Sequence, residues 1–169
     1  MKKVLVVVVI LALILGIGGT SWATGGVAFG TRYHMPVKDI AGTDFDKSHL
    51  SFSGGYRYKS NGFILDADVD YWTGVGDVTY SVTPKISLLF DIMILPIYAG
   101  LGVQKTYVKW GSDDTEWGDL TYVLQLGTEI LDLGSLTLLL DAYYDSTSLS
   151  LKDIDVGFIT LGARLIWYL

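Results

Sequence analysis

Alternation of apolar and polar residues with a period of two is the feature that most constrains this sequence. After residue 23 the alternation recurs in eight segments, and no stretch there shows the apolar stripe of an amphipathic helix. The segments cover residues 26 to 36, 48 to 59, 62 to 73, 78 to 90, 96 to 109, 119 to 131, 135 to 145 and 155 to 168. Most are about 10 to 14 residues long, whereas soluble strands usually have roughly 5 or 6 residues and bilayer-crossing strands about 9 to 11. We therefore predict an all-β chain of long strands.

The connections between these segments alternate in length. Short turns at 60 to 62, 91 to 95 and 132 to 134 alternate with longer polar loops at 37 to 47, 74 to 77, 110 to 118 and 146 to 154. Transmembrane barrels have short turns on one side, long loops on the other and an even number of strands. The pattern predicts an eight-stranded antiparallel up-and-down β-barrel. A turn at Thr83-Pro84-Lys85 would add a ninth strand and move the C-terminus to the wrong side, so we expect one continuous strand there.

The polarity of the two strand faces indicates which solvent each face meets. In the stretch GFILDADVDYW, three aspartates (Asp66, Asp68 and Asp70) share one face of a strand, and apolar residues such as Leu65 and Val69 share the other. Aromatic residues gather near the segment ends, as in the interfacial girdles of membrane barrels. A soluble ligand-binding barrel, which is the alternative, has its apolar side chains inside. We predict a transmembrane barrel with an apolar outer wall and a polar, side-chain-filled lumen.

The first 23 residues differ from the rest of the chain. Lys2 and Lys3 precede an apolar run from 4 to 17, and Ser21-Trp22-Ala23 has small residues before a cut. This pattern predicts a cleaved signal peptide over 1–23 and a barrel over 24–169. Without Lys2 and Lys3 the chain has ten basic and 18 acidic residues, a net charge of -8, so nucleic acid is not an expected partner. With no cysteine, the fold closes without disulfides.

Charged residues on the inward face predict a network that fills the lumen. Asn61-Gly62 is a signal for a type I′ hairpin, which places Arg57 opposite Asp66 and Gly55 opposite Asp68. The interior of an eight-stranded barrel is about wide enough to be filled by side chains, and an unpaired buried ion costs several kcal/mol. Near balance of the two signs favours a plug over a selective pore. The predicted network comprises Arg32, Arg57, Asp66, Asp68, Asp70, Lys85, Glu129, Asp141 and Arg164.

Two histidines expected near the outer mouth allow two chemical alternatives, a hydrolase site and a metal site. His49-Leu50-Ser51 resembles the His-x-Ser motif of outer-membrane lipid A deacylases, with Asp70 in position to orient the histidine. That family carries the motif near its C-terminus and acts at the lipid-facing surface, whereas His49 and Ser51 are expected to face inward. His34, His49 and Asp70 are also candidate ligands for Zn²⁺ or Cu²⁺. Solvated histidines at a polar rim are the simpler interpretation, so we predict no catalytic residue, no metal and no cofactor.

The last strand carries a motif of a known protein class. Thr160-x-Gly162-x-x-Leu165-x-Trp167 resembles the C-terminal signal of bacterial outer-membrane barrels that the barrel-assembly machinery reads, although Leu169 replaces the usual final aromatic residue. The mature chain resembles the small eight-stranded outer-membrane barrels of the OmpA-transmembrane and OmpX type. This resemblance implies the outer membrane of a Gram-negative-type bacterium, with lipid, lipopolysaccharide and the assembly machinery as partners.

The resemblance does not imply one activity, because this fold hosts scaffolds, adhesion proteins and lipid-modifying enzymes. We expect a monomeric, non-enzymatic barrel without an open pore that acts as a membrane scaffold or surface-interaction protein. The acidic outer loops are expected mainly to keep the surface hydrated. A lipid-modifying enzyme of the lipid A deacylase kind and a narrow channel remain the alternatives.

Overall fold

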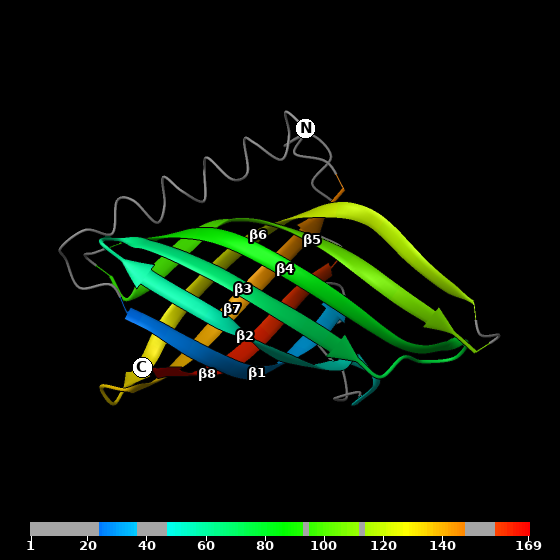
Figure 1. Cartoon of the computed structure of the whole chain (residues 1–169), viewed down its shortest axis with the longest axis horizontal. Helices are drawn as coiled ribbons and strands as arrows, with labels where there is room; N and C mark the ends of the chain where they lie inside the picture. Colours follow the sequence, from blue (N-terminus) through cyan, green and yellow to red (C-terminus); the bar gives the residue numbers. More distant parts are fainter. Residues whose placement is uncertain (1–23, 37–46, 93–94, 112–113, 148–157) are drawn as a thin grey trace.

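The computed structural model describes residues 24–36, 47–92, 95–111, 114–147 and 158–169. Its eight strands form one closed antiparallel barrel in which each strand pairs with its neighbours in sequence and β8 closes on β1 (Figure 1). This confirms the predicted up-and-down topology, and the predicted signal peptide lies outside the described residues. The strands are β1 (Thr24–Pro36), β2 (Leu50–Ser60), β3 (Phe63–Trp72), β4 (Val78–Ile92), β5 (Ile97–Trp110), β6 (Thr115–Asp132), β7 (Leu136–Ser146) and β8 (Phe158–Tyr168).

The hairpin between β2 and β3 has the predicted turn and register. Asn61 and Gly62 have φ angles of 45° and 83°, the left-handed values that a type I′ turn requires at both central positions. Arg57 lies opposite Asp66, and Gly55 lies opposite Asp68, as the turn predicts. β4 also runs through Pro84 without a turn, which confirms the count of eight strands.

Two segments differ from the prediction at the long-loop end. β6 begins at Thr115, four residues before the predicted start, so β5 and β6 form a long hairpin (Figure 1). Its polar composition suggested a loop, but Tyr107 pairs with Trp117 across the strands, and their ring centroids are 5.3 Å apart. Such cross-strand aromatic pairs stabilise β-structure. A 3-10 turn, η2 (Lys47–His49), occupies the predicted start of the second strand.

The outer wall is apolar and the interior is polar. Phe29, Phe52 and Trp167 are 62%, 58% and 59% exposed, whereas Arg57 and Asp66 inside the barrel are 0% and 1% exposed. This inverts the pattern of a soluble barrel and is the pattern of a transmembrane barrel, as predicted. Within the described ranges, the structure has no helix that is both long and apolar enough to cross a membrane.

The lumen is layered along the barrel axis. Buried apolar side chains fill its inner, short-turn end, around Ile64, which follows the β2–β3 turn. The sequence prediction did not include this layer, because it assigned the inward face as polar throughout. We call this set the apolar layer, and it consists of Ala28, Ile64, Leu89, Tyr98, Leu139 and Ile166. Charged residues occupy the next level, and a cavity lies between them and the outer mouth.

Candidate functional site

Asp66 is the centre of the charged level of the lumen. Its carboxylate accepts two hydrogen bonds from the facing Arg57, at 2.7 Å from Nε and 2.6 Å from Nη2. Arg164 of β8 donates a third from Nη2 at 2.8 Å. The register of the β2–β3 hairpin places Arg57 opposite Asp66. Arg164 comes close to Asp66 because β8 pairs with β1 and closes the barrel. Asp66 therefore neutralises guanidinium groups from two strands.

Asp141 connects this centre to the apolar layer. It accepts hydrogen bonds from Arg164 Nε at 2.8 Å, from Tyr98 Oη at 2.7 Å and from Gln125 Nε2 at 2.9 Å. Tyr98 lies over Gly127, its cross-strand partner, and a Cβ at that position would collide with the tyrosine ring. A glycine at 127 is therefore what allows the tyrosine to reach across the lumen.

Asp68 and Asp70 form the outer part of the charged level with Arg32. Arg32 Nη2 lies 2.8 Å from Asp68 Oδ1, and Arg32 Nη1 lies 3.0 Å from Asp70 Oδ2. Lys85 Nζ and Arg164 Nη1 also approach Asp68 Oδ2, at 3.6 and 3.5 Å. These ion pairs continue those of Asp66 and Asp141 without a break. We call the eight residues together the charge layer: Arg32, Arg57, Asp66, Asp68, Asp70, Lys85, Asp141 and Arg164.

The charge layer is balanced and buried. Its four cations face four carboxylates, and all eight residues are buried. Buried ions persist only when they are paired and hydrogen-bonded, because desolvation costs several kcal/mol per ion. Such a layer has no surplus charge to attract one sign of ion, and the apolar layer beneath it offers no polar path. The side chains of the two layers are thus buried against one another at two successive levels of the lumen.

Glu129, which the sequence analysis also placed in this network, lies elsewhere. Its carboxylate pairs with Lys59 Nζ at 2.8 Å near the inner rim, and the same amine lies 2.9 Å from Asp91. The sequence analysis did not single out Lys59, Tyr98 or Tyr143, although Lys59 shares the inward parity of Arg57. The alternation along the strand therefore already indicated that Lys59 faces inward.

At the outer mouth, a chain of hydrogen bonds joins four strands. Thr160 Oγ1 lies 3.1 Å from His34 Nδ1, and His34 Nε2 lies 2.9 Å from Ser51 Oγ. Ser51 donates its proton to Asp70 Oδ1 at 3.0 Å. His34 Nε2 must then donate to Ser51, so it is not placed to accept the proton of the serine as a general base would. Ser51 is also 0% exposed, which does not suit a nucleophile.

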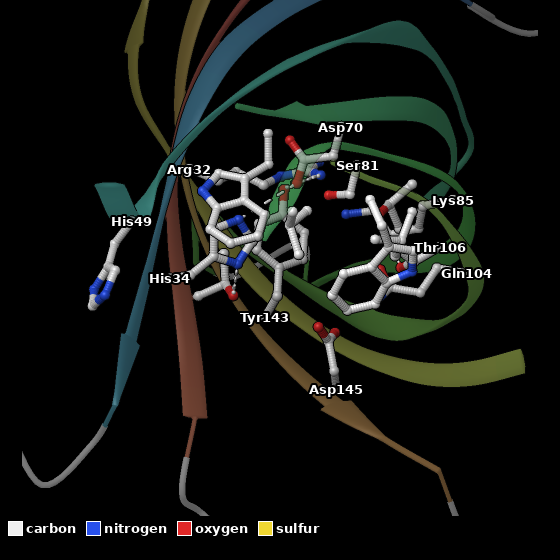
Figure 2. A pocket seen from close by; sticks show the side chains of 16 residues that line it. Arg32, His34, His49, Asp70, Ser81, Lys85, Gln104, Thr106, Tyr143 and Asp145 are labelled. Carbon is white, nitrogen blue, oxygen red and sulfur yellow. Dashed lines mark hydrogen bonds and ion pairs between the residues drawn. The ribbon is translucent and has the colours of Figure 1, made fainter. Parts of the chain in front are cut away.

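His49 does not join His34 as the sequence suggested. Its ring centroid lies 5.8 Å from that of Tyr33, and Figure 2 shows it apart from His34 and Asp70. His49 belongs to the single turn of η2 and not to a strand, and it lies at the edge of the cavity at the outer mouth. His34 Nε2 lies 3.9 Å from Asp70 Oδ2. The described part of the chain contains no group of three His, Cys, Asp or Glu residues that could hold a metal ion.

The outer part of the lumen contains a cavity of about 420 Å³, which we call the outer cavity (Figure 2). Arg32, Lys85 and Tyr143 contribute to its lining, and so does His34. The rest of the lining consists of two tryptophans, two valines, four hydroxyl-bearing residues, Gln104, His49, Asp70 and Asp145. The lumen is thus filled by side chains at the apolar and charge layers and open above them.

The four residues of the predicted assembly signal lie on two faces of β8. Leu165 and Trp167 are exposed on the outer wall, at 44% and 59%. Thr160 is buried and contacts His34, and Gly162 lies opposite Asp141. The apolar members of the motif are therefore accessible from outside the barrel. That the barrel-assembly machinery recognises this motif stays a prediction.

Comparisons with known proteins give structural matches only. No protein-family model matches the chain, and no curated protein matches it. A de novo designed transmembrane β-barrel matches with 8% identity and a TM-score of 0.46, over 89% of this chain and 98% of that chain. Neisserial surface protein A matches with 13% identity and a TM-score of 0.46, over 87% and 97%. Ail, the attachment invasion locus protein of Yersinia pestis, matches with 14% identity and a TM-score of 0.34, over 87% and 97%.

Because these TM-scores are low, the fold assignment rests on the strand register of this chain itself. That register closes eight antiparallel strands between β1 and β8, with the start of β1 beside the end of β8, where Leu169 N donates to Gly25 O at 2.8 Å. Together with the apolar outer wall, it confirms the predicted resemblance at the level of the fold. The chain is a small, closed, eight-stranded transmembrane β-barrel.

Proposed function

We propose that this protein is a monomeric, non-enzymatic outer-membrane barrel that acts as a membrane scaffold or surface-interaction protein and does not conduct ions. The observation that carries the proposal is the stack of a charge layer on an apolar layer inside a closed barrel. Function then belongs to the surfaces that the barrel presents, namely its outer wall and its long-loop end.

An outer-membrane location is supported by features of the sequence and the structure together. The predicted signal peptide provides export, and the motif on β8 presents Leu165 and Trp167 outward. Aromatic side chains of the outer wall also contact one another near the long loops: Tyr71 stacks on Tyr80 with centroids 5.9 Å apart, and Tyr80 adjoins Tyr107 at 6.5 Å. Such rings favour a membrane interface.

Planar-bilayer recording tests the closed lumen. We expect the wild-type barrel to give no steady single-channel current, because the charge layer fills its cross-section. Replacing Arg57 and Arg164 by serine removes the two guanidinium groups around Asp66, and replacing Leu89 and Leu139 by serine as well opens the apolar layer beneath them, so this combined variant should conduct. A Lys59→Ser variant is the control, since Lys59 lies at the rim. A steady current through the wild-type protein would overturn the proposal.

Two further measurements test the remaining parts of the proposal. Membrane fractionation of cells that express the full chain should place it in the outer membrane, and size-exclusion chromatography in detergent should give a monomer. Mass spectrometry of lipid A from cells with and without the protein should show identical species. A protein-dependent loss of acyl chains would instead establish the lipid-modifying alternative.

A further inference from the structure

We propose that the outer cavity binds a small zwitterion with a planar apolar body, for which a free aromatic α-amino acid is the simplest probe. The inference goes beyond the scaffold function, which uses only the outer wall and the loops. The cavity has a volume of about 420 Å³, within the range of roughly 300 to 1,000 Å³ typical of small-molecule sites. Its lining provides one group for each part of such a ligand.

Lys85 provides the group for a carboxylate. Its side chain is 1% exposed, and its ammonium lies 3.6 Å from Asp68 Oδ2 and 3.7 Å from the centroid of the Tyr143 ring. Asp68 already accepts a hydrogen bond from Arg32 at 2.8 Å. An ammonium has three donors, and 3.6 Å is longer than an ordinary hydrogen bond, so Lys85 can donate to a closer acceptor. Figure 2 shows its nitrogen directed into the cavity.

Asp145 provides the group for an ammonium. It is exposed at the rim of the cavity, where Gln104 hydrogen-bonds its carboxylate. A carboxylate has about four acceptor sites, so further donors can bind. Asp70, the other carboxylate of the lining, is already engaged by Arg32 Nη1 at 3.0 Å and by Ser51 at 3.0 Å. Asp145 therefore remains available.

The charges of the lining select against simple ions. Arg32 and Lys85 are matched by Asp70 and Asp145, so the cavity has no net charge when its histidines are neutral. A plain carboxylate would gain Lys85 but meet Asp145, and a plain amine would gain Asp145 but meet Lys85. A molecule with both charges satisfies both groups at once, which is the physical reason for expecting a zwitterion.

The tryptophans provide the surface for a planar apolar body. Trp72 and Trp110 both line the cavity, and they come from the long-loop ends of β3 and β5. Trp72 Nε1 donates to Ser48 O at 2.6 Å, which fixes the orientation of its indole. Indole faces bind planar apolar groups favourably. Val78 and Val108 extend this apolar lining.

Isothermal titration calorimetry of the purified barrel in detergent tests the proposal with three probes. The first is L-phenylalanine, the second is 3-phenylpropionate, which lacks the ammonium, and the third is phenethylamine, which lacks the carboxylate. We expect phenylalanine to bind at least about tenfold more tightly than either matched ion, because each matched ion lacks one of the two charged hydrogen bonds.

Variants assign the binding to the two charged groups. Lys85→Met should weaken phenylalanine binding by about tenfold or more, and Asp145→Asn should remove the preference for phenylalanine over 3-phenylpropionate. Lys105→Met is the matched control, because Lys105 lies on the outer wall, where its Nζ is 5.6 Å from the centroid of the Trp117 ring.

Three results would overturn the proposal. The first is no phenylalanine binding tighter than about 1 mM, and the second is equal affinity of the wild-type protein for phenylalanine and 3-phenylpropionate. The third is unchanged binding by a folded Lys85→Met variant. The comparison of probes on the wild-type barrel needs no variant, so a folding defect in Lys85→Met leaves the first two results decisive. The planar-bilayer recording tests the proposed function separately. None of the three results changes the expectation that the wild-type barrel does not conduct.

Discussion

Substitution of Asp66 by asparagine should destabilise the barrel strongly, because it removes the charge that neutralises Arg57. Asp66 makes the two short hydrogen bonds to Arg57, at 2.7 and 2.6 Å, and both residues are fully buried. Breaking one side of a buried ion pair costs about 3 to 5 kcal/mol. Arg164 keeps its bond to Asp141 at 2.8 Å, and asparagine can still accept one bond, so we expect the lower end, about 3 kcal/mol.

Equilibrium unfolding by urea in lipid vesicles measures this loss. A change of about 3 kcal/mol corresponds to roughly a hundredfold shift of the unfolding equilibrium. Asp91→Asn is the matched control: Asp91 also pairs with a cation, Lys59 at 2.9 Å, but these side chains are 21% and 30% exposed. Partly exposed pairs contribute about 0 to 1 kcal/mol.

A second variant tests the cause of the loss. Adding Arg57→Met to Asp66→Asn removes the unpaired guanidinium, so the double variant should be more stable than Asp66→Asn alone. Equal losses for Asp66→Asn and Asp91→Asn, or no recovery in the double variant, would refute the assignment of a buried, tightly coupled charge layer.

Three further predictions concern the wall, the strands and the turn. Trp167→Asp should reduce the amount of heat-modifiable barrel in the membrane. Leu133→Asp is the control and should not reduce it, because Leu133 is also exposed, at 63%, but lies outside β8. Equal membrane levels of the two variants would count against an assembly signal. Gly55→Ala should lower the free energy of unfolding by about 1 to 3 kcal/mol, because its Cβ would collide with the backbone of β3. The adjacent Gly54→Ala has open space and should be neutral or slightly stabilising, so similar denaturation curves for the two would contradict the packing. Gly62→Ala should cost about 1 to 2 kcal/mol, since φ is 83° there; an unchanged midpoint would argue against the turn.

The charge layer shows where sequence reasoning succeeded and where it stopped. The pair of Arg57 with Asp66 follows from one hairpin, because turn type sets register and register sets partners. Arg164 reaches the same carboxylate from 98 residues away. That contact depends on the tilt and stagger of all eight strands, which no local pattern contains. Glu129 illustrates the same limit, since its parity did not reveal that it lies at the rim with Lys59.

The outer mouth required the tertiary structure for a different reason. His34 and His49 are symmetric about the first long loop in the sequence, but η2 interrupts the alternation just before β2. His34 consequently bridges Thr160 and Ser51, while His49 lies against Tyr33. The three residues of η2 stand where the alternation of a strand was expected, and alternation alone therefore did not give the contacts of His49.

The sequence by itself determined that this chain forms eight long strands, which face is apolar, and how β2 pairs with β3. These properties are local: they follow from a period of two, from turn residues and from the lengths of the connections. The tertiary structure alone decided which charges meet, that an apolar layer closes the inner end of the lumen, and that a cavity remains above the charge layer. Those features depend on where strands far apart in the chain place their side chains along the barrel axis, which is set only when β8 closes on β1.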